Sequence, residues 1–290
     1  MKNTTIRLFA AALMVGLGWS CEKVIPIDAE VKAPKLVANS WVSPDTTYTV
    51  HLSQSLSVLA EGDLENIENG TVRVLDAGGS LIETLTHAGE GYYTGNERPV
   101  VGSTYRIEAS APGFNSISAS SSVPGPSTIV SASGRSQSVG FEESLEVTVT
   151  IQDAPGDNYY LLRLRRRRDS TRPDFNYYFI TTNDPAFELS GDDDGSASWG
   201  PFRDVLFDGE NYTFKITVPF FFFDPEDDNL PFEIELYSTN EAGYNYRRSF
   251  ELYKQTEGNP FAQPVQVFSN VEGGFGCVSG YSLTTLSFEL

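Results

Sequence analysis

Residues 71–85 read TVRVLDAGGSLIETL and indicate a β-hairpin. Thr71 to Leu75 alternates polar and apolar side chains, as a strand with one buried face does. Asp76 to Gly79 supplies turn residues, and Leu81 to Leu85 supplies the returning strand. This stretch predicts an antiparallel sheet that packs one face on a core, and therefore a mainly β protein.

Further segments with strand patterns lie on both sides of this hairpin. They are Leu36 to Val42, Tyr48 to Leu52, Tyr92 to Tyr93, Ser103 to Ala109 and Ile117 to Val123. About seven short strands at this spacing are typical of a β-sandwich. Pro124-Gly125-Pro126 ends the unit, because proline cannot donate to a strand ladder. We predict an N-terminal β-sandwich over residues 35–126.

A second β-rich domain is predicted over residues 127–290, which fits roughly 150 residues per domain. The Tyr177 to Thr181 segment is expected to pair with the Asn158 to Arg166 segment. The strand candidates are Leu145 to Gln152, Asn158 to Arg166, Tyr177 to Thr181, Asp204 to Phe207, Tyr212 to Val218 and Phe232 to Tyr237. We therefore expect a second sandwich-like domain.

One amphipathic helix is predicted near residues 241–255, in this second domain. Tyr246, Phe250 and Tyr253 recur at helical spacing and are expected to pack on the second sheet. Ser238 and Thr239 offer an N-cap, and Glu241 stands three residues after Ser238, as in a capping box. The alternative is one long strand.

The N-terminus has the pattern of an export signal. Lys2 and Arg7 precede the apolar or small run Leu8 to Gly18, and Ser20 stands directly before Cys21. The run is shorter than the roughly 20 residues that a membrane-spanning helix needs.

We therefore predict a signal peptide over residues 1–20 and lipidation of Cys21. Residues 21–34 are expected to form a lipidated tether, because they are proline-punctuated and carry no strand pattern. Acyl chains on Cys21 would hold the chain to a membrane. The lipobox match is imperfect, since Gly18 stands where leucine is usual, and the alternative is a plain secretory signal.

The composition is acidic and rich in aromatic residues. The formal net charge is −19, and aromatic residues make up 12% of the chain. Such a charge disfavours nucleic acid as a partner, and the aromatic content argues against disorder. With Cys21 and Cys277 as the two cysteines, acylation of the first leaves no disulfide.

Three stretches resemble one family. The first runs from Leu36 to Trp41 with Ser43-Pro44 and Tyr48, and the second from Gly102 to Ala109 with Gly113-Phe114 and Val123-Pro124. The third contains Asn259-Pro260-Phe261, Pro264-Val265 and the run Ser269 to Gly276, SNVEGGFG. With these stretches the chain is similar to the domain-of-unknown-function 4249 family of Bacteroidota lipoproteins, from Cys21 almost to the C-terminus. Gly18 and Cys277 depart from the expected pattern.

The resemblance implies an outer-membrane lipoprotein, often encoded near TonB-dependent receptors, with no established activity. The N-terminal domain also resembles immunoglobulin-like and carboxypeptidase-regulatory-like modules. Surface export in some of these lipoproteins uses an acidic stretch after the cysteine, whereas Lys23 here follows a single Glu22. The periplasmic and cell-surface faces of the outer membrane both stay open.

No catalytic constellation is evident, so we expect no enzyme and no cofactor. The histidines are His51, in a predicted strand, and His87, in the hairpin, and each is expected to be structural or at the surface. Cys277 is expected to be a small buried hydrophobic residue.

Two acidic loops could supply oxygen ligands for calcium, through Asp192 and Asp194 and through Asp224 and Asp227. Their spacing does not match the EF-hand pattern, and a solvated loop is the favoured alternative. The run Phe220 to Phe223 could form a partner-binding patch or part of the core.

The only basic block, Arg165 to Arg168 with Arg163 nearby, could recognise carboxylates or a charged glycan. Arg165 and Arg167 share one face of the predicted strand and are the binding candidates. A neighbouring acidic loop could instead pair with these arginines inside the protein.

The sequence thus favours a lipid-anchored, non-catalytic accessory or ligand-binding partner of a TonB-dependent receptor. The alternatives are a surface hydrolase that uses carboxylates of the acidic loops, and a structural or adhesive envelope protein.

Overall fold

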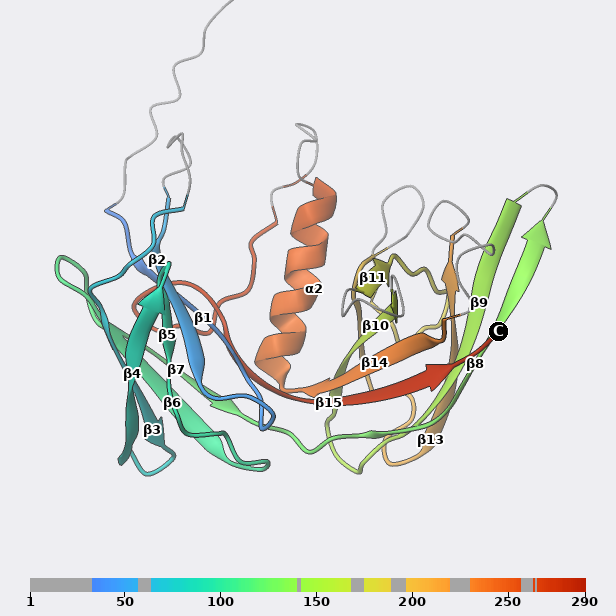
Figure 1. The fold of residues 1–290 in the computed structure, drawn as a ribbon, viewed down its shortest axis with the longest axis horizontal. Coiled ribbons are helices and arrows are strands. Elements are labelled where there is room, and N and C mark those ends of the chain that lie inside the picture. Colours follow the sequence, from blue (N-terminus) through green and yellow to red (C-terminus); the bar gives the residue numbers. More distant parts are fainter. Residues whose placement is uncertain are drawn as a thin grey trace, which may run out of the picture. The chain divides into compact units, whose positions relative to one another are not determined.

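The computed structural model describes residues 33–56, 64–139, 142–167, 175–188, 197–219, 230–256, 263 and 265–290 (Figure 1). Strands dominate these residues, which confirms the mainly β class. The strands are β1 (Leu36–Val42), β2 (Thr49–Gln54), β3 (Thr71–Asp76), β4 (Leu81–Gly89), β5 (Tyr92–Thr94), β6 (Thr104–Ser110), β7 (Ile117–Ser122), β8 (Thr128–Val139), β9 (Glu142–Gln152), β10 (Tyr159–Arg167), β11 (Phe175–Tyr178), β12 (Gly200–Arg203), β13 (Asn211–Val218), β14 (Phe232–Thr239) and β15 (Val278–Phe288). Helix α2 spans Glu241–Thr256.

Strands β1 to β7 coincide with the strands predicted before residue 126. Their inward side chains form a mostly aliphatic cluster, which we call the first core. It includes Leu36, Leu52, Val72, Tyr93 and Ile107. Alternation explains it, because every second residue of β1 and β6 is buried. The hairpin that begins at Thr71 is present, with a register shift between Val74 and Leu75.

The second core is rich in aromatic residues. It combines inward residues of β9, β10, β13 and β14 with rings from the connections between them. Phe187 and Phe202 stack with ring centroids 4.5 Å apart, and Tyr160 stacks on Phe202 at 4.9 Å. Its members include Leu145, Val149, Tyr160, Leu162, Phe187, Phe202, Phe214, Phe232 and Ile234.

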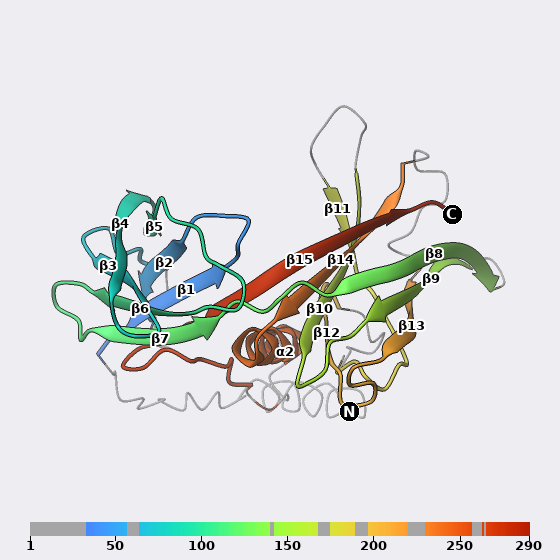
Figure 2. The same cartoon turned by 90° about the horizontal axis from the view of Figure 1, so that it is seen from below.

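Strand β15 hydrogen-bonds to strands that border both cores (Figure 2). Its first residues, Val278 to Gly280, pair in parallel with Ser40 to Val42 of β1. Its remaining residues pair antiparallel with β14. The result is a 12-stranded sheet, beside a three-stranded sheet of β13, β9 and β8.

The division of the chain near residue 126 stays a prediction. Residues Pro34–Leu56 and Glu61–Leu290 belong to one compact unit. Val271 and Val278, far along the chain, pack into the first core.

The second region differs from the prediction at one turn and in several strands. Asp204 to Phe207 is a turn rather than a strand, and the hydrogen bond from Phe207 N to Asp204 O (2.7 Å) closes it. The strand in this part of the chain is β12, which ends directly before Asp204. Strands β8 and β15 were not predicted, because serine, threonine and glycine dilute their apolar alternation. The predicted pairing of the Tyr177 segment is confirmed, since β11 lies antiparallel to β10.

The predicted helix is confirmed as α2, but its cap and buried face differ. Asn240 caps it through Oδ1, which accepts from Gly243 N at 3.1 Å, whereas Ser238 and Thr239 are the last two residues of β14. The buried residues of the helix are Gly243, Tyr244 and Glu251. At Gly243 the absence of a side chain lets the helix approach Thr239 and Ser279 closely.

The predicted aromatic stripe of α2 stacks mainly on itself. The ring centroids of Tyr246 and Phe250 lie 5.9 Å apart, and Tyr253 is exposed. Tyr246 also contacts Trp41 of β1 at 6.2 Å. Within the described residues, no helix has the length and apolar character needed to cross a membrane.

Candidate functional site

Several predicted site residues lie outside the described residues. They are the lipidation candidate Cys21, the calcium candidates Asp192, Asp194, Asp224 and Asp227, and the patch Phe220 to Phe223. Lipidation and calcium binding therefore stay predictions.

The binding candidate Arg165 is paired inside the protein. Its guanidinium contacts Glu233 at 2.8 Å and Glu235 at 2.5 Å, and lies 3.8 Å from the Phe175 ring centroid. Both glutamates belong to β14, so a neighbouring strand provides the pairing rather than an acidic loop. Arg167 is exposed at the end of β10.

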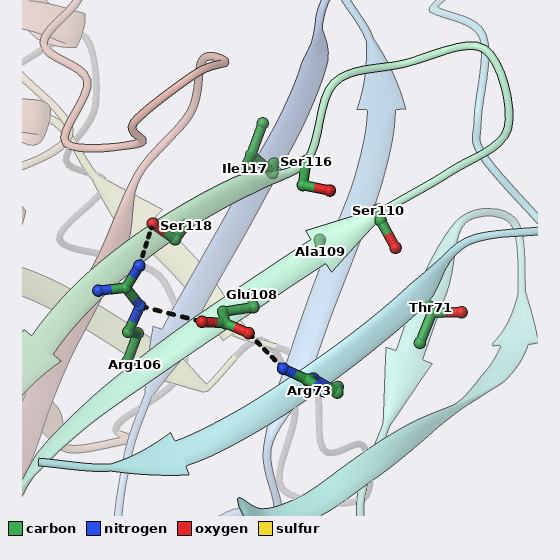
Figure 3. A pocket seen from close by; sticks show the side chains of 9 residues that line it. All are labelled: Thr71, Arg73, Arg106, Glu108, Ala109, Ser110, Ser116, Ile117 and Ser118. Atoms are coloured by element: carbon green, nitrogen blue, oxygen red, sulfur yellow. Dashed lines mark hydrogen bonds and ion pairs between the residues drawn. The ribbon is translucent and has the colours of Figure 1, made fainter. Parts of the chain in front are cut away.

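A groove of about 460 Å³ lies on the outer face of β3, β6 and β7. Figure 3 shows Arg73, Arg106 and Glu108 beside a stretch of short side chains. Strand alternation places these charged residues outward, while Val72 and Ile107 point into the first core. The hollow exists because the neighbouring outward side chains are short, and these include Thr71, Ser110, Ser116 and Ser118.

The charges of this groove form one connected network (Figure 3). Glu108 contacts Arg73 at 2.6 Å and Arg106 at 3.3 Å, through its two carboxylate oxygens. Arg106 donates to Ser118 Oγ at 3.0 Å, and Ser118 donates to Glu272 at 3.3 Å. Because the side chains of Arg73 and Arg106 are 48% and 47% exposed, part of each guanidinium faces solvent.

This arrangement suits a polar ligand that offers hydrogen-bond acceptors. Guanidinium groups donate to carboxylate, phosphate and sugar oxygens, and serine hydroxyls donate or accept. No pattern in the sequence indicated Arg73 and Arg106 as site residues. The available signal was the register of neighbouring strands, since Arg73 and Glu108 lie directly opposite each other.

The two histidines and Cys277 do not converge on a nucleophile. His51 bonds Asn66 Oδ1 through Nε2 at 3.0 Å, and His87 lies beside the Tyr93 ring at 5.2 Å. Cys277 is 1% exposed, as predicted, and burial raises the pKa of its thiol to about 12. A thiol with this pKa stays protonated at neutral pH.

Three carboxylates, those of Asp153, Asp204 and Asp208, come together with oxygens within 4.8 Å of one another. Burial raises the pKa of Asp153. Each carboxylate already accepts a hydrogen bond that fastens the surrounding loops, so we assign the cluster a structural role. The donors are Tyr160 Oη and Gly209 N for Asp153, Asn158 N for Asp204 and Gly156 N for Asp208.

A family model described as "Domain of unknown function (DUF4249)" matches residues 22–287. No curated protein matches the chain. A solved structure titled "Biofilm associated protein - BSP domain" is similar at 9% identity and a TM-score of 0.21. The similarity covers 91% of this chain and 62% of that one, and so low a TM-score carries no argument about fold or function.

Proposed function

The chain belongs to the DUF4249 family of unknown function, and we propose that it is a lipid-anchored, non-catalytic binding protein. In this proposal, acyl chains on Cys21 hold it in the outer membrane, where it acts beside a TonB-dependent receptor. The signal pattern around Cys21 and the family resemblance support this address.

The groove on β3, β6 and β7 carries the binding part of the proposal. Its two guanidinium groups are half exposed, and each is fixed by a contact to Glu108. Groups held in place in this way lose little side-chain freedom when a ligand arrives. The groove therefore suits an acceptor-rich ligand, or an acceptor-rich loop of the receptor.

The same contacts argue against hydrolysis at this groove. Glycoside hydrolysis needs two carboxyl groups that face the scissile bond, one of which protonates the leaving group. Both carboxylate oxygens of Glu108 contact arginines, and Glu272 accepts a hydrogen bond from Ser118 Oγ. The proposal therefore includes neither catalysis nor a cofactor.

The test is co-purification of the full-length protein after mild detergent extraction from its own envelope. We expect a TonB-dependent receptor to be recovered with the wild type. The double variant Arg73→Ala/Arg106→Ala is expected to reach the membrane normally but to recover at least about tenfold less receptor, the loss expected from about 1.4 kcal/mol. Absence of any receptor with the wild type would count against the role beside a TonB-dependent receptor.

Two controls separate the anchor from the groove. Cys21→Ser is expected to move the protein out of the membrane fraction. Arg98→Ala removes another arginine of the same region, whose Nη1 donates to Asp45 O at 2.9 Å outside the groove, and should leave recovery unchanged. Equal recovery with the double variant and the wild type excludes the groove as the contact.

A further inference from the structure

Arg163 of β10 and Arg247 of α2 lie against the same indole ring, that of Trp199. Their Cζ atoms are 4.3 and 4.2 Å from its centroid. Arg163 also covers the Tyr177 ring at 3.5 Å, and Arg247 lies 5.3 Å from the Trp41 ring. We call Trp41, Arg163, Trp199 and Arg247 the arginine–tryptophan cluster. Helix α2 contacts β10, so the fold brings these residues, which are distant in the sequence, to one place.

Both guanidinium groups lack a carboxylate partner among the described residues. The Nε atoms of Arg163 and Arg247 are buried and have no hydrogen-bond acceptor there. Arg165, two residues along the same face of β10, has Glu233 and Glu235 as partners and donates through Nε at 2.9 Å. A buried donor without an acceptor costs about 1–3 kcal/mol.

Burial and the charge of Arg163 also disfavour the charged form of the Arg247 guanidinium. Burial lowers the pKa of Arg247, and the charge of Arg163 lowers it further, although Tyr246, Glu251 and Tyr237 act in the opposite direction. Burial raises the pKa of the Glu251 carboxyl on α2, although the charges of Lys254, Arg247 and Arg163 lower it. Two cations thus share one aromatic ring, and the Glu251 carboxylate interacts with both of them without forming an ion pair in the described part of the chain.

A guanidinium that stacks on an aromatic ring keeps its N–H groups free in the plane of the group. Those N–H groups match the oxygens of a carboxylate or a phosphate, and such charge-assisted bonds are about twice as strong as neutral ones. We propose that the arginine–tryptophan cluster binds an oxyanion, the carboxylate or phosphate group of a small molecule, through Arg163 and Arg247. This site is distinct from the groove around Arg73 and independent of the proposed function.

The intrinsic fluorescence of the protein gives a direct test. The chain has three tryptophans, and Trp19 lies in the predicted signal peptide, so both tryptophans of the processed chain belong to the cluster. We would titrate the purified lipidated protein with inorganic phosphate and with succinate, with chloride as the control at fixed ionic strength. A saturable change in emission with phosphate or succinate, absent with chloride, is expected. Trp199→Phe should remove most of it.

Substitutions at the two arginines sharpen the assignment. Arg163→Ala and Arg247→Ala should each weaken the apparent affinity at least about tenfold, the equivalent of about 1.4 kcal/mol. Should either fail to fold, Arg163→Lys and Arg247→Lys keep the charge and the stem but lose Nε, and should weaken binding as well. The control Arg73→Ala/Arg106→Ala leaves the cluster intact and should bind like the wild type, which separates this test from that of the groove.

Three results would overturn the proposal. The first is no saturable response of the wild type, and the second is an equal response to chloride. The third is a response seen only in the variant Asp192→Asn/Asp193→Asn/Asp194→Asn. Such a result would mean that, in the wild type, carboxylates of the chain itself occupy the site.

Discussion

The two regions differ in the side chains that form their cores and in how their arginines are placed. The first core is aliphatic, and its arginines, Arg73 and Arg106, stay half exposed on the outer face of the sheet. The second core is rich in aromatic rings, and Arg163 and Arg247 of the same region lie against the Trp199 ring where α2 approaches β10. Exposed ion pairs contribute about 0–1 kcal/mol, whereas buried charges must be paired or neutralised. The second region therefore depends far more on the identity of each charged residue.

The largest effect is expected from Phe202→Ala in the second core. Phe202 is fully buried and stacks on Phe187 and Tyr160, so the cavity should cost about 3–5 kcal/mol of the free energy of unfolding. Urea denaturation measures it. Because β15 pairs with both β1 and β14, we expect one transition that shifts as a whole. Two separate transitions, with the first core unaffected, would show that the regions unfold independently.

Gly276→Ala tests the segment that leads into β15. Gly276 has a φ of +111°, and an added Cβ would lie 2.1 Å from Ala38 O of β1. The left-handed backbone costs about 1–2 kcal/mol and the overpacking about 1–3 kcal/mol more. Gly102→Ala is the control, because Gly102 has a φ of +80° but open space around the added Cβ. If thermal denaturation gives equal losses for both variants, the close approach to β1 is not important.

Tyr160→Phe and Tyr93→Phe compare one buried hydroxyl in each core. Tyr93 Oη donates to Ile67 O at 2.9 Å and accepts from Gly70 N at 2.8 Å, whereas Tyr160 Oη donates to Asp153. Each substitution leaves buried groups unpaired, at about 1–3 kcal/mol. We expect Tyr160→Phe to be the more costly, since its partner is a carboxylate. Guanidinium denaturation of both variants tests this order, and the reverse order would contradict it.

A pH series tests the carboxylate under Tyr160. Burial raises the pKa of Asp153 above its unfolded value, although the bonds from Tyr160 and Gly209 act in the opposite direction. The folded state therefore binds the Asp153 proton more tightly than the unfolded state does. This tighter binding stabilises the folded state fully below about pH 4, and the stabilisation is lost as the pH rises through the raised pKa. A tenfold difference in proton affinity between the folded and unfolded states corresponds to a loss of about 1.4 kcal/mol.

The matched variant for this series is Asp153→Asn, which cannot ionise. Its free energy of unfolding should fall less than that of the wild type as the pH rises above about 4, the ordinary pKa of an aspartate. Parallel curves for the two proteins would mean that Asp153 does not titrate differently in the folded state.

The smallest effect is expected from Arg73→Ala on the outer face of the first region. Its ion pair with Glu108 is half exposed, so its loss should change the free energy of unfolding by about 0–1 kcal/mol. Thermal denaturation at low and high salt measures it, and the difference should shrink in salt. A loss above about 2 kcal/mol would remove the contrast between the two regions.

Local patterns in the sequence were sufficient for most of the elements. Alternation located β1 to β7, and the spacing of Tyr246, Phe250 and Tyr253 located α2. Both patterns depend on residues within one helical turn or one strand, so they can be recognised from the sequence alone. The strand predicted at Asp204 to Phe207 was wrong, because these residues form a turn with a hydrogen bond from Phe207 N to Asp204 O.

The candidate sites were much less predictable. Arg165 was a binding candidate from its basic block, yet Glu233 and Glu235 pair with it. The groove was not predicted, and of the arginine–tryptophan cluster only Arg163 was named as a possible binding residue, because each site joins residues from separate strands or from a strand and a helix.

The sequence alone determined the β class, the strands around the first core, the position of the helix, the burial of Cys277 and the family. Tertiary structure alone decided that β15 pairs with both β1 and β14, and which arginines are paired. The physical reason is range. Strand and helix patterns come from residues a few positions apart, whereas pairing partners such as Arg165 and Glu233 meet only after the whole sheet has formed.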